Sequence, residues 1–239
     1  MTKGFRFTAK YFMFWGSIFS QWHKATFKDC DGTEFSSAEQ FMFYHKARLF
    51  NDTESLKAIM ATTDPKKQKA LGRGVKGFTE ELWIEHREKI VFLGSFYKFS
   101  QNKELRNDLL FFGDRTFVEA SPVDKIWGVG LHYNDVRAED PTQWNGLNLL
   151  GKQLNLAAKE IVTDSFALVH SYEDTLYAFK ITTEAEDYVK NLFEGIELTE
   201  DNRTLGYFKS KVLKEKGPAF VKANDKAIDL AIKAELYKA

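Results

Sequence analysis

The stretch Ser36–Phe50, SSAEQFMFYHKARLF, decides how the centre of this chain folds. A serine placed three residues before a glutamate or glutamine is typical of a helix start, because each side chain can cap a backbone N–H near the other. The stretch has this spacing twice, in Ser36 with Glu39 and in Ser37 with Gln40. It therefore predicts a helix that starts at one of these serines and runs to the end of the stretch.

Three side chains of this helix, Glu39, Phe43 and Lys46, are expected on one face, since seven residues make almost two helical turns. A lysine against apolar walls loses affinity for its proton and becomes nucleophilic. Both polar residues also have a structural interpretation, because Glu39 can complete a capping box and Lys46 can extend along the surface to water. Spacing alone leaves both interpretations open.

A second group of polar and aromatic residues follows a strand-like run at 116–118, and its members are Glu119, Asp124, Trp127 and Gly128. We expect this group to meet the face of the predicted helix in space. As a structural alternative, Asp124 can be a turn or helix-cap residue and Trp127 can belong to the core. Together the acids, the lysine and the indole indicate the site of a nucleotide-processing enzyme.

The remaining elements are predicted from periodicity and turn residues. We expect one strand over 5–14, and a hairpin that joins strands near 25–27 and 34–35. Helices are expected at 53–60, 65–71, 80–92, 104–110 and 147–161. Beyond residue 162 we expect strands at 166–170 and 176–181, and helices at 184–193 and 219–237. The sequence thus predicts a predominantly helical α+β domain at 1–163 with a C-terminal α/β extension at 164–239.

The composition excludes several classes of protein. The chain has 239 residues with 34 basic and 34 acidic side chains, so no global field attracts nucleic acid or an anionic membrane. Cys30 is the single cysteine, which excludes an internal disulfide and favours a cytoplasmic location. No apolar run approaches the roughly 20 residues of a membrane span. From Asn202 onward nine basic and four acidic residues suggest a tail that faces a polyanion or simply a solvated helix face.

Other motifs limit the chemistry further. The run 72–77, GRGVKG, matches a dinucleotide-binding pattern, but a lysine-rich segment precedes it where that fold needs a buried strand. We reject this interpretation, although Arg73 beside flexible glycines can reach a phosphate. The five histidines show no metal-ligand spacing, so we expect no metal and no cofactor.

The chain resembles the NADAR superfamily, also called YbiA-like, over about residues 10–162. The resemblance is carried by ordered blocks: Phe14-Trp-Gly16, Phe19-Ser-Gln-Trp22, Gly32-x-x-Phe35-x-Ser37-Ala-Glu-Gln40, Lys46-Ala47, Phe50-x-Asp52, Asp64-Pro65, Gly72-Arg73, Trp83, Lys98-Phe-Ser-Gln-Asn102, Leu109-Leu110, Val118-Glu-Ala-Ser-Pro122, Asp124-x-Ile-Trp-Gly-x-Gly130 and Trp144-x-Gly-x-Asn-x-Leu-Gly151. One departure is Ala157-Ala-Lys159, where the family often has an arginine.

The resemblance implies a compact α+β domain that binds ribose-phosphate nucleotides and hydrolyses N-glycosidic bonds. By position, Lys46 would attack C1′ of the ribose, Glu39 would shuttle a proton and Asp124 would orient the ribose hydroxyls. The implied binding residues are those that stack on a base, hold phosphate or line the pocket: Trp15, Gly16, Phe19, Arg73, Trp83, Glu119, Trp127 and Gly128.

The resemblance leaves the substrate open. ADP-ribose on guanine in DNA is slightly preferred, since the basic tail could hold a single strand of DNA. Ribosylamino-pyrimidine phosphates of riboflavin synthesis are the nearest alternative. A third possibility is a module that binds ADP-ribose or another NAD derivative without turnover, although pure binding does not need a nucleophile beside two acids.

Overall fold

The structure, a computed structural model, describes residues 4–163, 169, 171–173, 184–194, 196, 198–199, 202 and 204–238. The chain divides into two compact units, a main unit at Met1–Glu173 and a C-terminal unit at Asp174–Ala239. The strand expected at 176–181 lies outside the described residues. So does the one expected at 166–170, except for Val169, which is helical.

The main unit contains a three-stranded sheet in the order β1 (Gly4–Phe7), β2 (Tyr11–Trp15) and β5 (Thr116–Glu119). The prediction of one strand over 5–14 is wrong, because Thr8 closes a turn by accepting from Tyr11 N through its hydroxyl and donating its own N–H to Tyr11 O. Strand β2 runs antiparallel to β1 and parallel to β5. Because β2 and β5 are parallel, the loops after them leave from one edge of the sheet.

The predicted hairpin is confirmed as β3 (Lys24–Lys28) paired antiparallel with β4 (Glu34–Ser37). Helix α1 (Ala38–Leu49) follows at once, and the hydroxyl of Ser37 caps it by accepting from Gln40 N at 3.1 Å. The Gln40 side chain returns to accept from Ser36 N at 2.8 Å. Ser37 and Gln40 therefore cap the helix, and the alternative box of Ser36 with Glu39 does not form.

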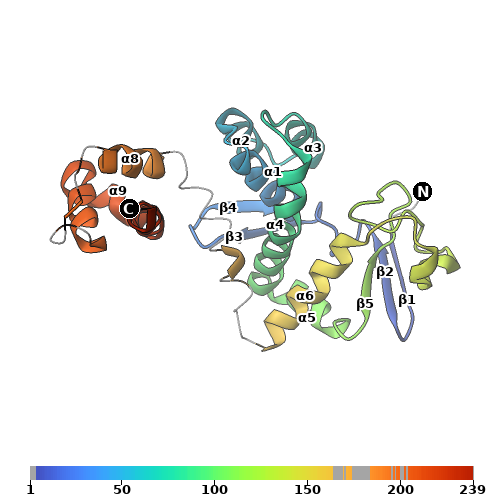
Figure 1. Cartoon of the computed structure of the whole chain (residues 1–239). Coiled ribbons are helices and arrows are strands. Elements are labelled where there is room, and N and C mark those ends of the chain that lie inside the picture. Colours follow the sequence, from blue (N-terminus) through green and yellow to red (C-terminus); the bar gives the residue numbers. More distant parts are fainter. Residues whose placement is uncertain are drawn as a thin grey trace. The chain divides into compact units, whose positions relative to one another are not determined.

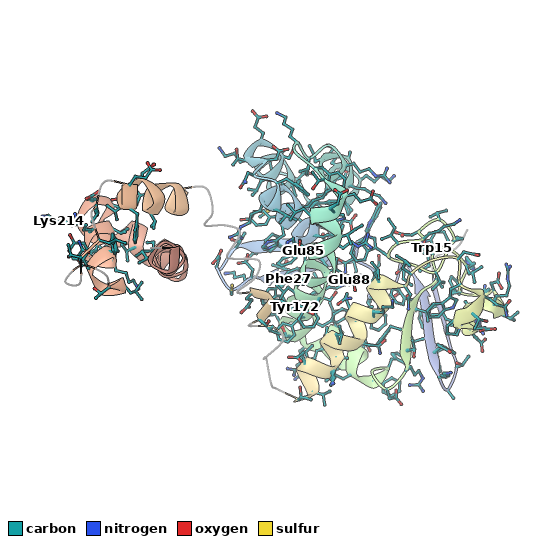
Figure 2. All side chains as sticks on the ribbon, viewed as in Figure 1. Trp15, Phe27, Glu85, Glu88, Tyr172 and Lys214 are labelled. Carbon is teal, nitrogen blue, oxygen red and sulfur yellow. The ribbon has the colours of Figure 1, made fainter. Side chains whose placement is uncertain are left out.

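Helix α1 is the centre of the main unit, since all twelve of its residues are buried. It packs against α2 (Thr53–Met60), α3 (Pro65–Arg73) and α4 (Glu80–Gln101). Figure 1 shows α4 passing through the middle of the unit, with α6 (Leu149–Thr163) between it and the sheet. Gln153 of α6 donates to Glu88 of α4 at 2.9 Å, and Figure 2 labels that carboxylate.

Most of the predicted helices are confirmed, with corrected ends. Helix α4 continues nine residues past the predicted end. Residues 90–99 are all buried, so this part of the helix has no amphipathic pattern from which the sequence could predict it. Helix α5 (Lys103–Phe111) follows it, and two short 3₁₀ turns, η1 (Val136–Glu139) and η2 (Pro141–Gln143), precede α6. Helix α3 ends at Arg73, not at Leu71, so Gly72 lies inside its last turn.

The C-terminal unit contains α8 (Glu184–Glu194) and α9 (Leu205–Lys238), and it has its own core around Val189, Phe208, Val212, Ile228 and Ile232. The helices predicted at 184–193 and 219–237 are confirmed, although α9 begins earlier. Gly217 has a φ of 81° directly before Pro218, so α9 changes direction there. None of the helices in the described residues is both long enough and apolar enough to cross a membrane.

Candidate functional site

Two loops and one helix start converge at the edge of the sheet. The loop after β2 carries Gln21 and Trp22, and the loop after β5 carries Asp124; the parallel pairing of the two strands brings both loops to one edge. Helix α1 begins beside the first loop, because Glu39 N donates to Gln21 O at 3.0 Å. The polar groups that the sequence separates by some eighty residues thus meet at one place.

Glu39 is the buried acid of this site, with 4% of its surface exposed. Burial raises the pKa of its carboxyl from 4.5 to about 7, and the charge of Asp124 contributes in the same direction. The cations of Lys69 and Arg73 and a hydrogen bond from the Trp22 indole act in the opposite direction. Because Gln40 performs the capping, the Glu39 carboxyl is available for chemistry, and near neutral pH it can both give and accept a proton.

Asp124 combines a structural role with a position in the site. Its Oδ1 accepts from Ile126 N at 2.9 Å and from Trp127 N at 2.8 Å, which fixes the turn after β5. The same half-buried carboxylate acts on the pKa of Glu39. The turn-residue interpretation of Asp124 is therefore confirmed and its functional interpretation stays a prediction, while Trp127 is half-buried and not a core residue.

Glu119 and Gly128 hold the two ends of this loop together. Glu119 is buried, with 7% of its surface exposed, and its carbonyl accepts from Val129 N at 2.9 Å. A Cβ atom at Gly128 would lie 2.6 Å from the Glu119 carbonyl oxygen, so only glycine fits. The structure thus supports a positioning role for Gly128, which draws the loop back onto the end of β5.

Helix α3 brings two cations to the site. Lys69 and Arg73 are four residues apart and so lie on one face of the helix. The Lys69 amine lies 5.4 Å from the centroid of the Trp22 ring, within the range of a cation–π contact. Sequence reasoning did not select Lys69 or Trp22, although the spacing of Lys69 from Arg73 was a signal that could have identified the lysine.

Close packing of α3 on α1 holds these cations in place. A Cβ atom at Gly72 would lie 1.9 Å from a ring carbon of Phe43, so the two helices approach at this glycine as closely as the backbone allows. The glycine of the rejected dinucleotide pattern therefore serves helix packing. Its carbonyl also accepts a hydrogen bond from the Lys46 amine at 2.9 Å.

Lys46 is not a snorkelling surface lysine, since only 8% of its surface is exposed. Its amine lies 4.2 Å from the ring centroid of Phe78 and 5.5 Å from that of Trp83. Burial lowers the pKa of Lys46. Burial therefore favours the neutral, nucleophilic form of the amine, and Gly72 O holds that amine beside the end of α3 that carries Arg73.

The remaining residues predicted to bind substrate have different environments. Phe19 is 2% exposed and packs against Phe12, Phe14, Phe99 and Phe117, so it is a core residue and its assignment as a pocket wall is wrong. Trp15, labelled in Figure 2, is half-buried at the end of β2, where it meets the His132 ring edge-on. Gly16 is exposed, with a φ of 72°, and turns the chain into the following loop.

This fold and site define an α+β domain with a buried acid, a loop carboxylate and a pair of cations at one edge of its sheet. A model of the NADAR domain matches residues 12–162, and the chain belongs to this family. It is 45% identical over 159 residues to N-glycosidase R617 of Acanthamoeba polyphaga mimivirus, a match that covers 62% of this chain and 94% of the viral protein.

Two further similarities extend the comparison. The chain is 29% identical over 133 residues to N-glycosidase Npun_R5314 of Nostoc punctiforme, covering 54% of this chain and 78% of that protein. The NMR structure of the Escherichia coli protein YbiA superposes with a TM-score of 0.54 at 22% identity, over 68% of this chain and 90% of YbiA. The expected YbiA-like α+β fold is therefore confirmed.

Proposed function

We propose that this NADAR protein is an N-glycosidase that hydrolyses the bond between C1′ of a ribose and a nucleobase nitrogen. The observation that carries the proposal is the meeting of Glu39 with the Asp124 loop, next to a cationic helix face. The two relatives named N-glycosidases support the reaction class. Cleavage of this bond builds positive charge on the ribose, and two carboxyl groups suit that charge and the departing nitrogen.

Glu39 acts as the general acid and base in this proposal. With a pKa of about 7 its carboxyl is partly protonated at neutral pH, so it can donate a proton to the leaving nitrogen. The resulting carboxylate then removes a proton from the water that completes hydrolysis. Asp124 binds ribose hydroxyls on the same side, using the carboxylate oxygen that its turn hydrogen bonds do not require.

Lys46 supplies the nucleophile. Its neutral amine forms a bond to C1′ while the bond from C1′ to the base breaks, and the ribose ring opens to give an imine. Water then adds to the imine, which regenerates the amine and releases the ribose as its free aldehyde form. The hydrogen bond to Gly72 O uses one N–H of the amine and leaves its lone pair for the attack.

The preferred substrate is ADP-ribose attached to guanine in DNA. Arg73 and Lys69 match the diphosphate, and the Trp22, Trp127 and Trp83 rings offer surfaces for a base. The charge of the C-terminal unit gives this preference little support, because residues 174–201 carry eight acidic and two basic side chains, which offsets the basic excess after Asn202. A ribosylamino-pyrimidine phosphate is the second candidate, since all of these residues lie in the main unit.

A product assay by mass spectrometry tests the proposal. Wild type and Lys46→Ala are compared on a guanine-ADP-ribosylated single-stranded oligonucleotide and on a ribosylamino-pyrimidine phosphate. Restored guanine, lost in the variant, supports the proposed reaction, and a borohydride-trapped adduct on Lys46 supports the imine. Cleavage of only the pyrimidine compound selects the second candidate. Binding of ADP-ribose without any product contradicts the enzymatic proposal.

A further inference from the structure

A buried lysine that the proposed reaction does not use lies beneath the loop after β2. Lys98 of α4 has 1% of its surface exposed, and it is among the largest fully buried side chains in the described residues. Its amine donates to Ile18 O at 2.6 Å and to Ser20 O at 3.0 Å. In the part of the chain that the structure describes, no carboxylate forms an ion pair with it.

This placement is costly for stability. An ammonium group without a counter-ion loses its hydration, and two carbonyl dipoles compensate only in part. Burial accordingly lowers the pKa of Lys98 to about 7. A methionine would fill the same space without this penalty, so packing does not explain the lysine. What distinguishes it is the ability to donate to two carbonyls that the loop turns inward.

The same loop supports the acid of the site. Its turns are closed by Ser20 N donating to Ser17 O and by His23 N donating to Ser20 O. Between these turns, Gln21 O accepts from Glu39 N, and the Trp22 indole donates to the Glu39 carboxyl. Lys98 therefore holds one side of a segment whose other side fixes both the backbone and the side chain of Glu39.

We propose that Lys98 is a positioning residue for the proposed glycosidase site. Its amine binds the carbonyls that the loop turns inward, and this contact fixes the loop so that the Trp22 indole reaches Glu39. The inference rests on the proposed function for its catalytic consequence, but not for its structural part. Without the lysine amine, Ile18 O loses its donor and turns toward water, while Ser20 O keeps only the hydrogen bond from His23 N. The loop then moves, and Trp22 no longer reaches Glu39.

Hydrogen exchange tests the structural part without any need for activity. Full-length wild type, Lys98→Met and Ile90→Ala are compared by mass spectrometry over peptides that cover 17–23 and 38–41. Ile90 is fully buried on the same helix, about 12 Å along its axis from Lys98. Ile90→Ala therefore controls for a general destabilisation of α4 that does not involve the loop carbonyls. We expect about tenfold faster exchange of these peptides in Lys98→Met than in Ile90→Ala.

The pH profile tests the catalytic part. The Trp22 hydrogen bond lowers the pKa of Glu39, so its loss raises that pKa. The alkaline limb of the rate should therefore move to higher pH in Lys98→Met and in Trp22→Phe, and the double variant should show no further shift. Additive shifts would mean that Lys98 acts on Glu39 directly by its charge, which overturns positioning through the loop.

The outcomes separate this inference from the proposed function. Unchanged exchange in a folded Lys98→Met variant, or equal acceleration in Ile90→Ala, overturns the positioning role whatever the activity. Faster exchange in a protein whose wild type shows no turnover supports the positioning role and contradicts the proposed reaction instead. Where Lys98→Met does not fold, Lys98→Gln is measured instead. Its amide on a shorter stem can replace the amine only in part, so we expect a smaller acceleration that still exceeds that of Ile90→Ala, and exchange no faster than in Ile90→Ala overturns the positioning role.

Discussion

Replacing Glu39 with glutamine should stabilise the main unit at alkaline pH while it removes activity. The folded-state pKa of Glu39 is raised from 4.5 to about 7 by burial. Its favourable contribution is therefore fully present below pH 4.5 and is lost as the pH rises through 7. Since one pKa unit corresponds to about 1.4 kcal/mol, ionisation of this carboxyl costs roughly 3 kcal/mol above pH 8. Glutamine has a similar shape and avoids this cost.

Urea unfolding followed by tryptophan fluorescence measures the effect in the intact chain. All five tryptophans lie between residues 15 and 144, so the signal reports the main unit alone. The stability difference between Glu39→Gln and wild type should grow from about pH 4.5 to pH 7 and then level off. The exposed Glu104→Gln serves as the control. A difference that is the same at pH 5 and pH 9 would refute the assignment of Glu39 as a buried, protonatable acid.

Three further changes test other parts of the site. Asp124→Asn keeps the turn hydrogen bonds but removes a charge, so kcat should fall about 100-fold. Because the charge of Asp124 raises the pKa of Glu39, the alkaline limb of the pH–rate profile should also move to lower pH. An unmoved limb would count against the proximity of the two carboxyl groups. Arg73→Ala should raise KM for phosphate-bearing substrates about tenfold, whereas the exposed Lys67→Ala should not; steady-state kinetics decide. Gly72→Ala should destabilise the main unit by about 1–3 kcal/mol in urea unfolding through its clash with Phe43, and an effect no larger than that of Gly74→Ala would argue against close packing of α3 on α1.

The sequence was most informative where local chemistry determines structure. The capping residues of α1 and the Asp52 and Asp64 caps of α2 and α3 are short-range signals, and each helix starts where they predict. The turn between β1 and β2 contains Thr8-Ala-Lys10 and has no glycine or proline, so two strands resembled one. The second half of α4 is buried on all sides, which leaves no periodic pattern to detect.

The site itself depends on tertiary contacts that spacing cannot give. Lys69 belongs to a lysine-rich run that is typical of a solvated face, and only the packing of Gly72 on Phe43 brings it beside Glu39. Trp22 reaches the same carboxyl because Gln21 O binds Glu39 N, and the Asp124 loop lies at the same edge because β2 and β5 pair in parallel, a pairing that such short strands do not reveal. Phe19 shows the opposite case, since an aromatic residue in a site motif proved to belong to the core.

The central claim is that Glu39 and Asp124 together form the catalytic site of an N-glycosidase. Single-turnover cleavage of a guanine-ADP-ribosylated oligonucleotide, with released ADP-ribose and restored guanine measured by mass spectrometry, tests it most directly. The account predicts cleavage by wild type and a loss of at least about 100-fold in both Glu39→Gln and Asp124→Asn. Cleavage at the wild-type rate by either folded variant would contradict it.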